Sequence, residues 1–174
     1  MAVGQATADE VGELPFAQLK LVASYTPPDG VPPEGHEMTC EITQDETGIT
    51  INGSQNFMHI YNPGVHRHSV EFNGQADLVS INQIPDGITS YRLLMPTASG
   101  SGWELVAPGN GRLCGEVKYA ELVIVFDSAG EFLGIETHSI RLVDERTGQD
   151  AWLSGLGWYV DFPGTQIHLL SVMD

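Results

Sequence analysis

Two short segments of this 174-residue sequence place a histidine two residues from a group that can move a proton or bind a metal ion. In Glu136-Thr137-His138, a carboxylate and an imidazole share one face of a strand, since alternate side chains of a strand point the same way. A carboxylate beside a histidine holds one imidazole tautomer and raises its basicity, as general acid–base catalysis requires. We therefore predict Glu136 and His138 as catalytic residues; a polar pair on the solvated side of a sheet is the alternative.

The second segment is His66-Arg67-His68, which follows a proline–glycine turn. Its two imidazoles are again two residues apart, so in a strand they project side by side and both can ligate one metal ion. In this respect the segment resembles part of the metal signature of the cupins. A metal site needs at least three ligands, and the sequence offers no third ligand beside His66 and His68. We therefore predict no metal and no cofactor; if a metal does bind, these two histidines are its ligands.

Tyrosine and tryptophan side chains occur on nearly every segment that we predict as a strand. A tyrosine ring offers an apolar wall with one hydrogen-bonding tip, which suits a cavity for a mostly apolar ligand; ordinary core packing is the alternative. Arg92 is a third catalytic candidate, because a guanidinium in such a cavity stabilises an oxyanion, although arginine is more often a surface residue. The predicted substrate-binding residues are Tyr61, Tyr91, Trp103, Tyr119, Trp158 and Tyr159.

The elements that position these residues are strands. Turn motifs built on proline, asparagine and glycine recur along the chain, and short segments rich in valine, isoleucine, threonine and tyrosine lie between them. Residues 17–25 alternate, with alanine, leucine and tyrosine on one face. Asn73-Gly74 predicts a tight hairpin between 70–72 and 76–84, since this dipeptide is the strongest short hairpin motif. Further strands are predicted at 37–61 (a long hairpin), 87–95, 113–126, 131–143, 151–162 and 166–173.

Consecutive hairpins without a crossover helix imply antiparallel pairing. About eight to ten such strands must hide their edges, either by closing into a barrel or by stacking as a sandwich. Polar and aromatic side chains share faces with aliphatic ones, which favours a barrel with a part-polar cavity. The prediction is an all-β fold: one closed antiparallel, lipocalin-like β-barrel that spans residues 1–174 as a single domain. Residues 1–14 are predicted to be flexible or to hold one short helix near 7–14, the only helix expected.

The composition is strongly acidic: 23 aspartates and glutamates against 7 lysines and arginines give a formal net charge of −16. Such a chain repels phosphate backbones and anionic headgroups, so we expect neither nucleic acid nor a membrane surface as a partner. The acidic residues are scattered and form no block of about five or more. We interpret the charge as a solubility feature, with a docking face for a basic protein as the alternative.

Two further features bear on the compartment. No window approaches the ~20 apolar residues that span a bilayer. The N-terminal segment, as given, lacks the cationic and apolar parts of a secretory signal, so we expect a cytoplasmic protein. Cys40 and Cys114 lie in apolar stretches with no other cysteine near them in sequence, which predicts buried free thiols instead of a disulfide.

The segment Gly109-Asn110-Gly111-Arg112-Leu113-Cys114-Gly115 resembles the G-x-G-x-F-x-G hairpin of allene oxide cyclase-like and dirigent-like barrels, with Leu113 in place of phenylalanine. Small bacterial β-barrel cyclases of natural-product pathways are similar in this region. The resemblance is confined to this one segment and carries no catalytic residue of those families onto the chain. It implies an allene oxide cyclase-like barrel that binds a flexible apolar substrate and orients it for ring closure without a cofactor.

These observations predict a cofactor-independent cyclase or isomerase that binds a small apolar metabolite, polyketide- or terpenoid-like, inside the barrel. Tyrosine and tryptophan would shape the substrate, while Glu136, His138 or Arg92 polarises a carbonyl or moves a proton. Two alternatives stay open. One is a non-catalytic ligand-binding or acidic docking protein, and the other is a metal-dependent, cupin-like enzyme that uses His66 and His68. A homodimer is left open as well.

Overall fold

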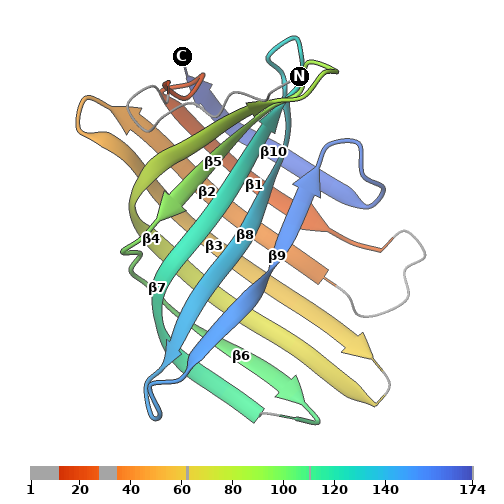
Figure 1. Ribbon diagram of the computed structural model, residues 1–174. Helices are drawn as coiled ribbons and strands as arrows, with labels where there is room; N and C mark the ends of the chain where they lie inside the picture. The colour runs from red at the N-terminus through yellow and green to blue at the C-terminus, as the bar shows by residue number, and fades with distance from the viewer. Residues whose placement is uncertain (1–11, 28–34, 62, 110, 174) are drawn as a thin grey trace.

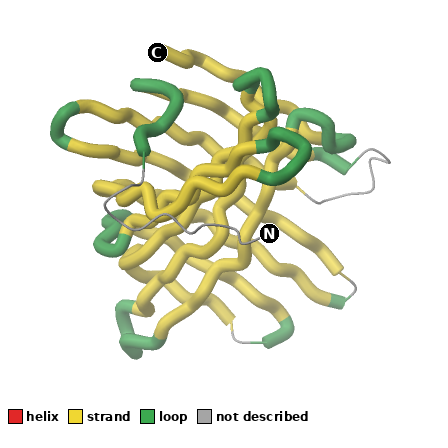
Figure 2. The backbone as a smooth tube through the Cα atoms, turned by 45° about the horizontal axis from the view of Figure 1, so that its top comes forward, coloured by secondary structure: helices red, strands yellow, loops and turns green. Residues whose placement is uncertain are grey.

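The computed structural model of the protein describes residues 12–27, 35–61, 63–109 and 111–173. Within these ranges strands make up most of the chain and no residue is helical, which confirms the all-β prediction (Figure 2). None of the described residues forms a helix long and apolar enough to cross a membrane. The short helix expected near 7–14 lies mostly outside the described residues. The ten strands are β1 (Gln18–Tyr25), β2 (Gly35–Asp45), β3 (Gly48–Tyr61), β4 (Gly64–Gln83), β5 (Thr89–Met95), β6 (Ser101–Ala107), β7 (Gly111–Phe126), β8 (Phe132–Asp144), β9 (Asp150–Tyr159) and β10 (Thr165–Met173).

These strands form one antiparallel sheet in the order β10-β1-β2-β3-β4-β5-β7-β8-β9, and β6 pairs with β4 and β7. β5 and β6 both lie between β4 and β7, each beside a different part of these two long strands. β4 pairs with β6 at 65–70 and with β5 at 77–83. β7 is divided in the same way, between β6 at 111–116 and β5 at 120–126. β6 therefore lies between the first parts of β4 and β7.

The sheet twists and curls, so that β7, β8 and β9 lie in front of β1 to β4 (Figure 1). β9 and β10, the two ends of the pairing order, come close to each other. No ladder among the described residues joins these two strands. The curl gives the sheet an inward face and an outward face, and the functional question is which side chains each face carries.

The inward face holds one contiguous apolar core. On β1 the predicted alternation is confirmed, because Leu19, Leu21 and Ala23 are buried while Lys20 is exposed. Burial of apolar surface stabilises the fold by roughly 25 cal/mol per Å². A slip of one residue in the pairing would turn all of these side chains outward. The core therefore fixes the register, and with it the residues that face outward.

Asn73 and Gly74 do not form a hairpin, so that prediction is wrong. They lie inside the continuous strand β4, where Gly74 has a φ of +155°. β3 pairs with β4 as far as Ala76, and the other edge of β4 pairs with Ser99 through Asn73. The glycine supplies backbone freedom, but the long register with β3 carries the strand straight through the motif.

β6 is absent from the sequence prediction, because turn motifs at 99–102 and 108–111 leave only a short segment between them. In the structure this segment pairs along both edges, with β4 and with β7. The approach to β4 is close: a Cβ on Gly100 would lie 2.0 Å from the carbonyl oxygen of Glu71. Glycine at this position is what allows β6, and Trp103 with it, to lie against β4.

The two cysteines are free thiols in different surroundings. Cys40 is buried as predicted, and burial together with the nearby Glu41 raises its pKa to about 12. Cys114 is exposed, so the prediction of a buried thiol is wrong there. It lies opposite Trp103 on the outward face of β7, because the core register turns the neighbouring positions inward.

Candidate functional site

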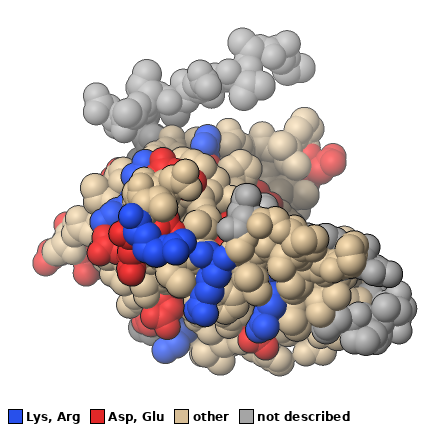
Figure 3. All heavy atoms as spheres, turned by 90° about the horizontal axis from the view of Figure 1, so that it is seen from below, with Lys and Arg blue, Asp and Glu red and all other residues tan. Residues whose placement is uncertain are grey.

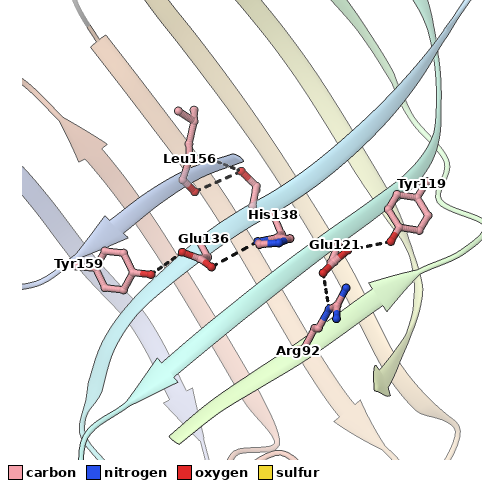
Figure 4. A network of polar contacts seen from close by, with 8 residues as sticks. Arg92, Tyr119, Glu121, Glu136, His138, Leu156 and Tyr159 are labelled. Atoms are coloured by element: carbon pink, nitrogen blue, oxygen red, sulfur yellow. Dashed lines mark hydrogen bonds and ion pairs between the residues drawn. The ribbon is translucent and has the colours of Figure 1, made fainter. Parts of the chain in front are cut away.

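Arg92, Tyr119 and Glu121 form one polar group on the outward face of β5 and β7 (Figure 4). Glu121 accepts a hydrogen bond from Arg92 Nε at 2.5 Å and one from the Tyr119 hydroxyl at 2.9 Å. The Glu121 side chain is only 4% exposed, whereas that of Arg92 is half exposed. Burial acts to raise the pKa of Glu121, but the hydrogen bonds from Arg92 and Tyr119 outweigh it and lower the pKa. Glu121 is thus an ionised carboxylate with both oxygens in use.

Glu136, His138 and Tyr159 form a second group of the same kind on β8 and β9. The Tyr159 hydroxyl donates to Glu136 Oε2 at 2.6 Å, and His138 Nδ1 lies 3.6 Å from Glu136 Oε1. Burial and the bond to Glu136 raise the pKa of Tyr159, so the phenol keeps its proton. The register of β7 and β8 shifts between Glu121 and Leu122, which leaves His138 as the extra residue of a bulge. The imidazole is well exposed there.

On the inward face, four rings from four strands stack in one row. Tyr25, His36, Phe57 and His68 are direct neighbours on β1 to β4. Their successive ring centroids are 5.3, 4.7 and 5.0 Å apart, and the planes are nearly parallel. The alternation of each strand turns all four side chains to the same side, so this row belongs to the interior.

His68 is almost fully buried and neutral at physiological pH. Its Nε2 lies 2.8 Å from the amide nitrogen of Gln55, and Gln55 Oε1 accepts a hydrogen bond from Thr137 Oγ1 at 2.5 Å. This network assigns the proton of His68 to Nδ1, which has no hydrogen-bond partner among the described residues. Burial, reinforced by His66 and His36, lowers the pKa of His68 to about 4.

His66 and His68 project from the same face of β4, as their spacing predicts, with ring centroids 6.0 Å apart. Their partners differ: His66 Nε2 lies 2.9 Å from Glu104 Oε1, whereas His68 is engaged by Gln55. Within the described residues, no three histidine, cysteine, aspartate or glutamate side chains are grouped so that they could hold a metal ion. The cupin-like enzyme stays a prediction.

Two grooves cross the outward face of the sheet over β1 to β4. The first has a volume of about 430 Å³; the second, of about 330 Å³, is bounded by Trp103 of β6 and is called the Trp103 groove below. Each strand contributes three consecutive residues, such as 56–58 and 67–69, and the middle residue faces inward. The middle residue therefore contributes backbone, and the walls are the side chains on either side of it. Both grooves lie outside the core.

Trp103 lies between two arginines. The guanidinium carbons of Arg67 on β4 and Arg112 on β7 are 5.8 and 5.2 Å from the centroid of the Trp103 ring. Both arginines pair with Leu105, from opposite edges of β6, and this pairing brings them to the tryptophan. We call these three residues, Arg67, Trp103 and Arg112, the arginine–tryptophan cluster. Sequence analysis named Trp103 but missed both arginines, because only the register of β6 brings the three strands together.

Most basic side chains of this acidic chain are paired with a carboxylate. The ion pairs are Lys20–Glu41, Arg92–Glu121, Lys118–Glu116 and Arg141–Asp150. Arg67 and Arg112 differ, since neither has a carboxylate oxygen of a described residue within 4 Å. Figure 3 shows one end of the molecule, where basic atoms border both acidic and uncharged ones and the acidic atoms form no continuous field.

The predicted catalytic residues Glu136, His138 and Arg92 are brought to one surface, on the outward face of the sheet. Neither groove over β1 to β4 is lined by them, and a third groove of about 370 Å³, at the other end of the sheet beside Tyr91, is not lined by them either. Their arrangement can hold and exchange a proton at the surface.

The aromatic residues predicted to bind substrate do not meet in one cavity. Trp158 is fully buried in the core, and Tyr91 points inward against Phe126. The side chain of Tyr61 lies outside the described part of the chain. The outward face carries the other three, Trp103, Tyr119 and Tyr159. Comparison with known proteins adds no assignment, because no protein-family model, no curated protein and no solved structure matches this chain.

Proposed function

We propose that this protein binds a small polar molecule on the outward face of its sheet, in the grooves over β1 to β4 and β6. The observation that carries the proposal is where the free volume lies. Two of the three grooves, of about 430 and 330 Å³, are on the outward face, whereas the third, of about 370 Å³, lies at one end of the sheet beside the inward-pointing Tyr91. One contiguous apolar core occupies the inward face. Volumes of several hundred Å³ suit a small ligand. The proposal corresponds to the ligand-binding alternative of the sequence analysis, with the ligand outside the sheet.

The walls of the grooves support a polar ligand, because they include several short hydrogen-bonding side chains. The hydroxyls of Thr39 and Ser54 lie 2.6 Å apart, and Ser69 donates to Asn56 Oδ1 at 2.7 Å. Hydroxyl and amide groups offer both donors and acceptors. A ligand with several hydrogen-bonding groups complements such walls better than the apolar metabolite expected from the sequence.

Filling the grooves tests the proposal. Ser54→Trp and Ser69→Trp each add a large ring to a groove wall, whereas Ser80→Trp adds the same ring to the outward face of β4 outside both grooves. We expect polar compounds found by thermal shift to raise the Tm of the wild type and of Ser80→Trp, because a ligand that binds the folded state stabilises it. The Tm increase should be lost in the variant whose groove is filled.

Three results would overturn this placement. One is a set of compounds whose effect survives both groove substitutions. Another is a pattern of amide chemical-shift changes confined to the inward face. The third is a broad library of polar metabolites that contains no stabilising compound.

We further propose that the sheet is a barrel whose seam, between β9 and β10, is closed by side-chain packing. The proximity of these two strands and the single contiguous core support it. Nuclear Overhauser contacts between methyl groups of β9 and β10 are the expected result. Their absence, together with fast amide exchange along both strand edges, would indicate an open sheet.

A second candidate function is proton transfer at the surface network, as in the cofactor-independent isomerase predicted from the sequence. The observation that favours it is the exposed His138 beside Glu136, with Arg92 in the adjoining group. A histidine next to a carboxylate can act as a base, and a guanidinium can polarise a carbonyl. Ring closure of an apolar metabolite inside the barrel stays a prediction.

This candidate can be tested before its substrate is known. Deuterium incorporation from D₂O is followed at the carbon beside the carbonyl in a panel of enolisable ketones. We expect incorporation above the buffer rate with the wild type, loss of that excess in Glu136→Gln and His138→Asn, and full activity in His168→Asn. His168 is a matched control, an exposed histidine on β10. Equal rates in all variants would contradict the candidate.

A further inference from the structure

The pairing of β4, β6 and β7 holds two cations against one aromatic ring. Arg67, Leu105 and Arg112 are direct neighbours across these strands, and Trp103 lies two residues before Leu105 on the same outward face. The guanidinium carbons are 5.8 and 5.2 Å from the ring centroid. Contact with a ring face orders a guanidinium without using its N–H donors, which stay available in the guanidinium plane.

The arginine–tryptophan cluster keeps hydrogen-bonding capacity that Arg92 and Lys118 use on carboxylates. The chain has 23 acidic residues for its 7 basic ones, so carboxylates are abundant. Even so, no carboxylate of a described residue lies within 4 Å of Arg67 or Arg112, whereas Arg92 and Arg141 each have one. An ordered guanidinium with free donors is a binding group for an oxyanion, and two of them on one ring can share it.

The Trp103 groove begins at this cluster and has opposite charges at two places along its length. Trp103, Ser69, Asn56 and Glu37 are direct neighbours on β6, β4, β3 and β2, and all four line the groove. Because neighbouring strands are about 4.8 Å apart, the row from Trp103 to Glu37 is roughly 14 Å long. It runs from a cationic end, past a hydroxyl and an amide, to a carboxylate.

We propose that the arginine–tryptophan cluster binds the carboxylate of a small hydroxylated organic acid whose body lies in the Trp103 groove. The ligand carboxylate accepts hydrogen bonds from Arg67 and Arg112. A ligand hydroxyl at the other end donates to Glu37, and the hydroxyl and amide groups between them contact the body. This inference rests on the proposed binding function and adds the chemical class of the ligand.

Two-dimensional NMR tests the inference with 4-hydroxybenzoate as the probe. Its neutral analogue 4-hydroxybenzamide, its dehydroxylated analogue benzoate and inorganic phosphate are the comparisons. We expect the probe to shift the Trp103 indole N–H signal, assigned with Trp103→Phe, together with amides of the groove, in a saturable manner. The amide analogue should bind about tenfold more weakly because it lacks the charge, and benzoate should bind more weakly because it lacks the donor to Glu37.

Arginine variants identify the groups that bind the anion. Arg67→Gln and Arg112→Gln are each expected to weaken binding of 4-hydroxybenzoate by about tenfold, which corresponds to one lost charge-assisted hydrogen bond. Arg146→Gln removes the same charge from the turn between β8 and β9, outside the groove, and is expected to leave the affinity unchanged. Unchanged amide spectra away from the substitution show that each variant is folded.

The outcomes separate the ligand class from the binding function. Equal affinity for the acid and its amide, or wild-type affinity in both arginine variants, overturns the anion site and leaves the binding function standing. Phosphate that displaces the probe, with no shift of any groove amide, would mean an adventitious anion only and would overturn the organic acid. If no probe and no library compound shifts a groove amide, both proposals are wrong.

Discussion

The outward face of the sheet differs between its two halves. On β5, β8, β9 and the part of β7 from Tyr119 onward, two carboxylates have partners within the protein, since Glu121 and Glu136 each accept a tyrosine hydroxyl and contact a basic group. On β1 to β4 and β6 the outward side chains leave two grooves. Beside the second groove, Arg67 of β4 and Arg112, at the start of β7, rest on Trp103 without a carboxylate of a described residue within 4 Å. Both halves share one core.

The difference teaches that the chemical type of a residue does not tell whether its hydrogen-bonding groups are free to bind a ligand. The first half contains the acid–base residues that sequence analysis selects, but its carboxylates, Glu121 and Glu136, already accept hydrogen bonds from within the protein. A buried carboxylate with all its partners in place stabilises the folded state and has little left to offer a ligand. The second half contains fewer conspicuous residues, yet it keeps unfilled donors beside an open groove.

The largest expected change in the free energy of unfolding concerns His68, on the inward face behind the Trp103 groove. The pKa of His68 is about 4 in the folded protein, against about 6.5 for an ordinary histidine. Between these values the unfolded chain binds a proton that the folded chain does not, so the free energy of unfolding falls as the pH is lowered. We expect a loss of about 3 kcal/mol from this group between about pH 7 and pH 4, measured by urea denaturation.

His36, His66 and Glu104 are the other ionisable side chains on the same face near His68, on β2, β4 and β6. The contribution of His68 is therefore the difference in pH slope between the wild type and His68→Gln, which should be shallower. His138→Asn, which removes an exposed histidine from the other half, should keep the wild-type slope. An unchanged slope in His68→Gln would contradict a buried neutral imidazole.

The next largest effect tests whether the paired half is structural. Glu121→Ala removes a buried carboxylate and leaves Arg92 and Tyr119 without their partner, so we expect a loss of about 2 kcal/mol in the free energy of unfolding at neutral pH. Because the pKa of Glu121 is lowered, its contribution to the free energy of unfolding is lost as the pH falls through the acid range. The free energy of unfolding of the variant should therefore decrease less steeply with falling pH than that of the wild type. Glu116→Ala, an exposed control on the same strand, should leave the free energy of unfolding nearly unchanged.

A smaller effect is expected at the second group of this half. Tyr159→Phe deletes the hydrogen bond to Glu136 and should lower the free energy of unfolding by about 1 kcal/mol, seen as a Tm decrease of a few degrees. In a spectrophotometric titration the wild type should contain a tyrosine that ionises above the usual range, and this step should be missing in the variant. A normal titration of Tyr159 would mean that the bond does not persist in solution.

The smallest effect belongs to the grooved half and completes the comparison. Arg67→Gln and Arg112→Gln should each change the free energy of unfolding by no more than about 0.5–1 kcal/mol, the usual contribution of an exposed cation–π contact. A double-mutant cycle with Trp103→Ala measures that contact directly. A loss comparable to that of Glu121→Ala would make these arginines structural and would count against their role in binding.

The sequence by itself determined the class of fold and most of the strands. The predicted segments 37–61, 87–95 and 166–173 each agree with observed strands to within about two residues, and the predicted inward face of β1 is the buried one. Alternation and turn motifs are properties of neighbouring residues, so they can be read without the rest of the molecule. The two errors, at Asn73-Gly74 and at β6, both concern how β4 pairs with distant segments.

In the candidate site, too, some features follow from local spacing and others only from the tertiary structure. Local spacing was enough to place Glu136 beside His138 and His66 beside His68, because residues two apart in a strand are neighbours. It did not decide that the first pair faces outward and the second faces the core. The arginine–tryptophan cluster joins three strands through the register of β6. Only the tertiary structure decided that contact, since the register depends on burying the whole inward face at once.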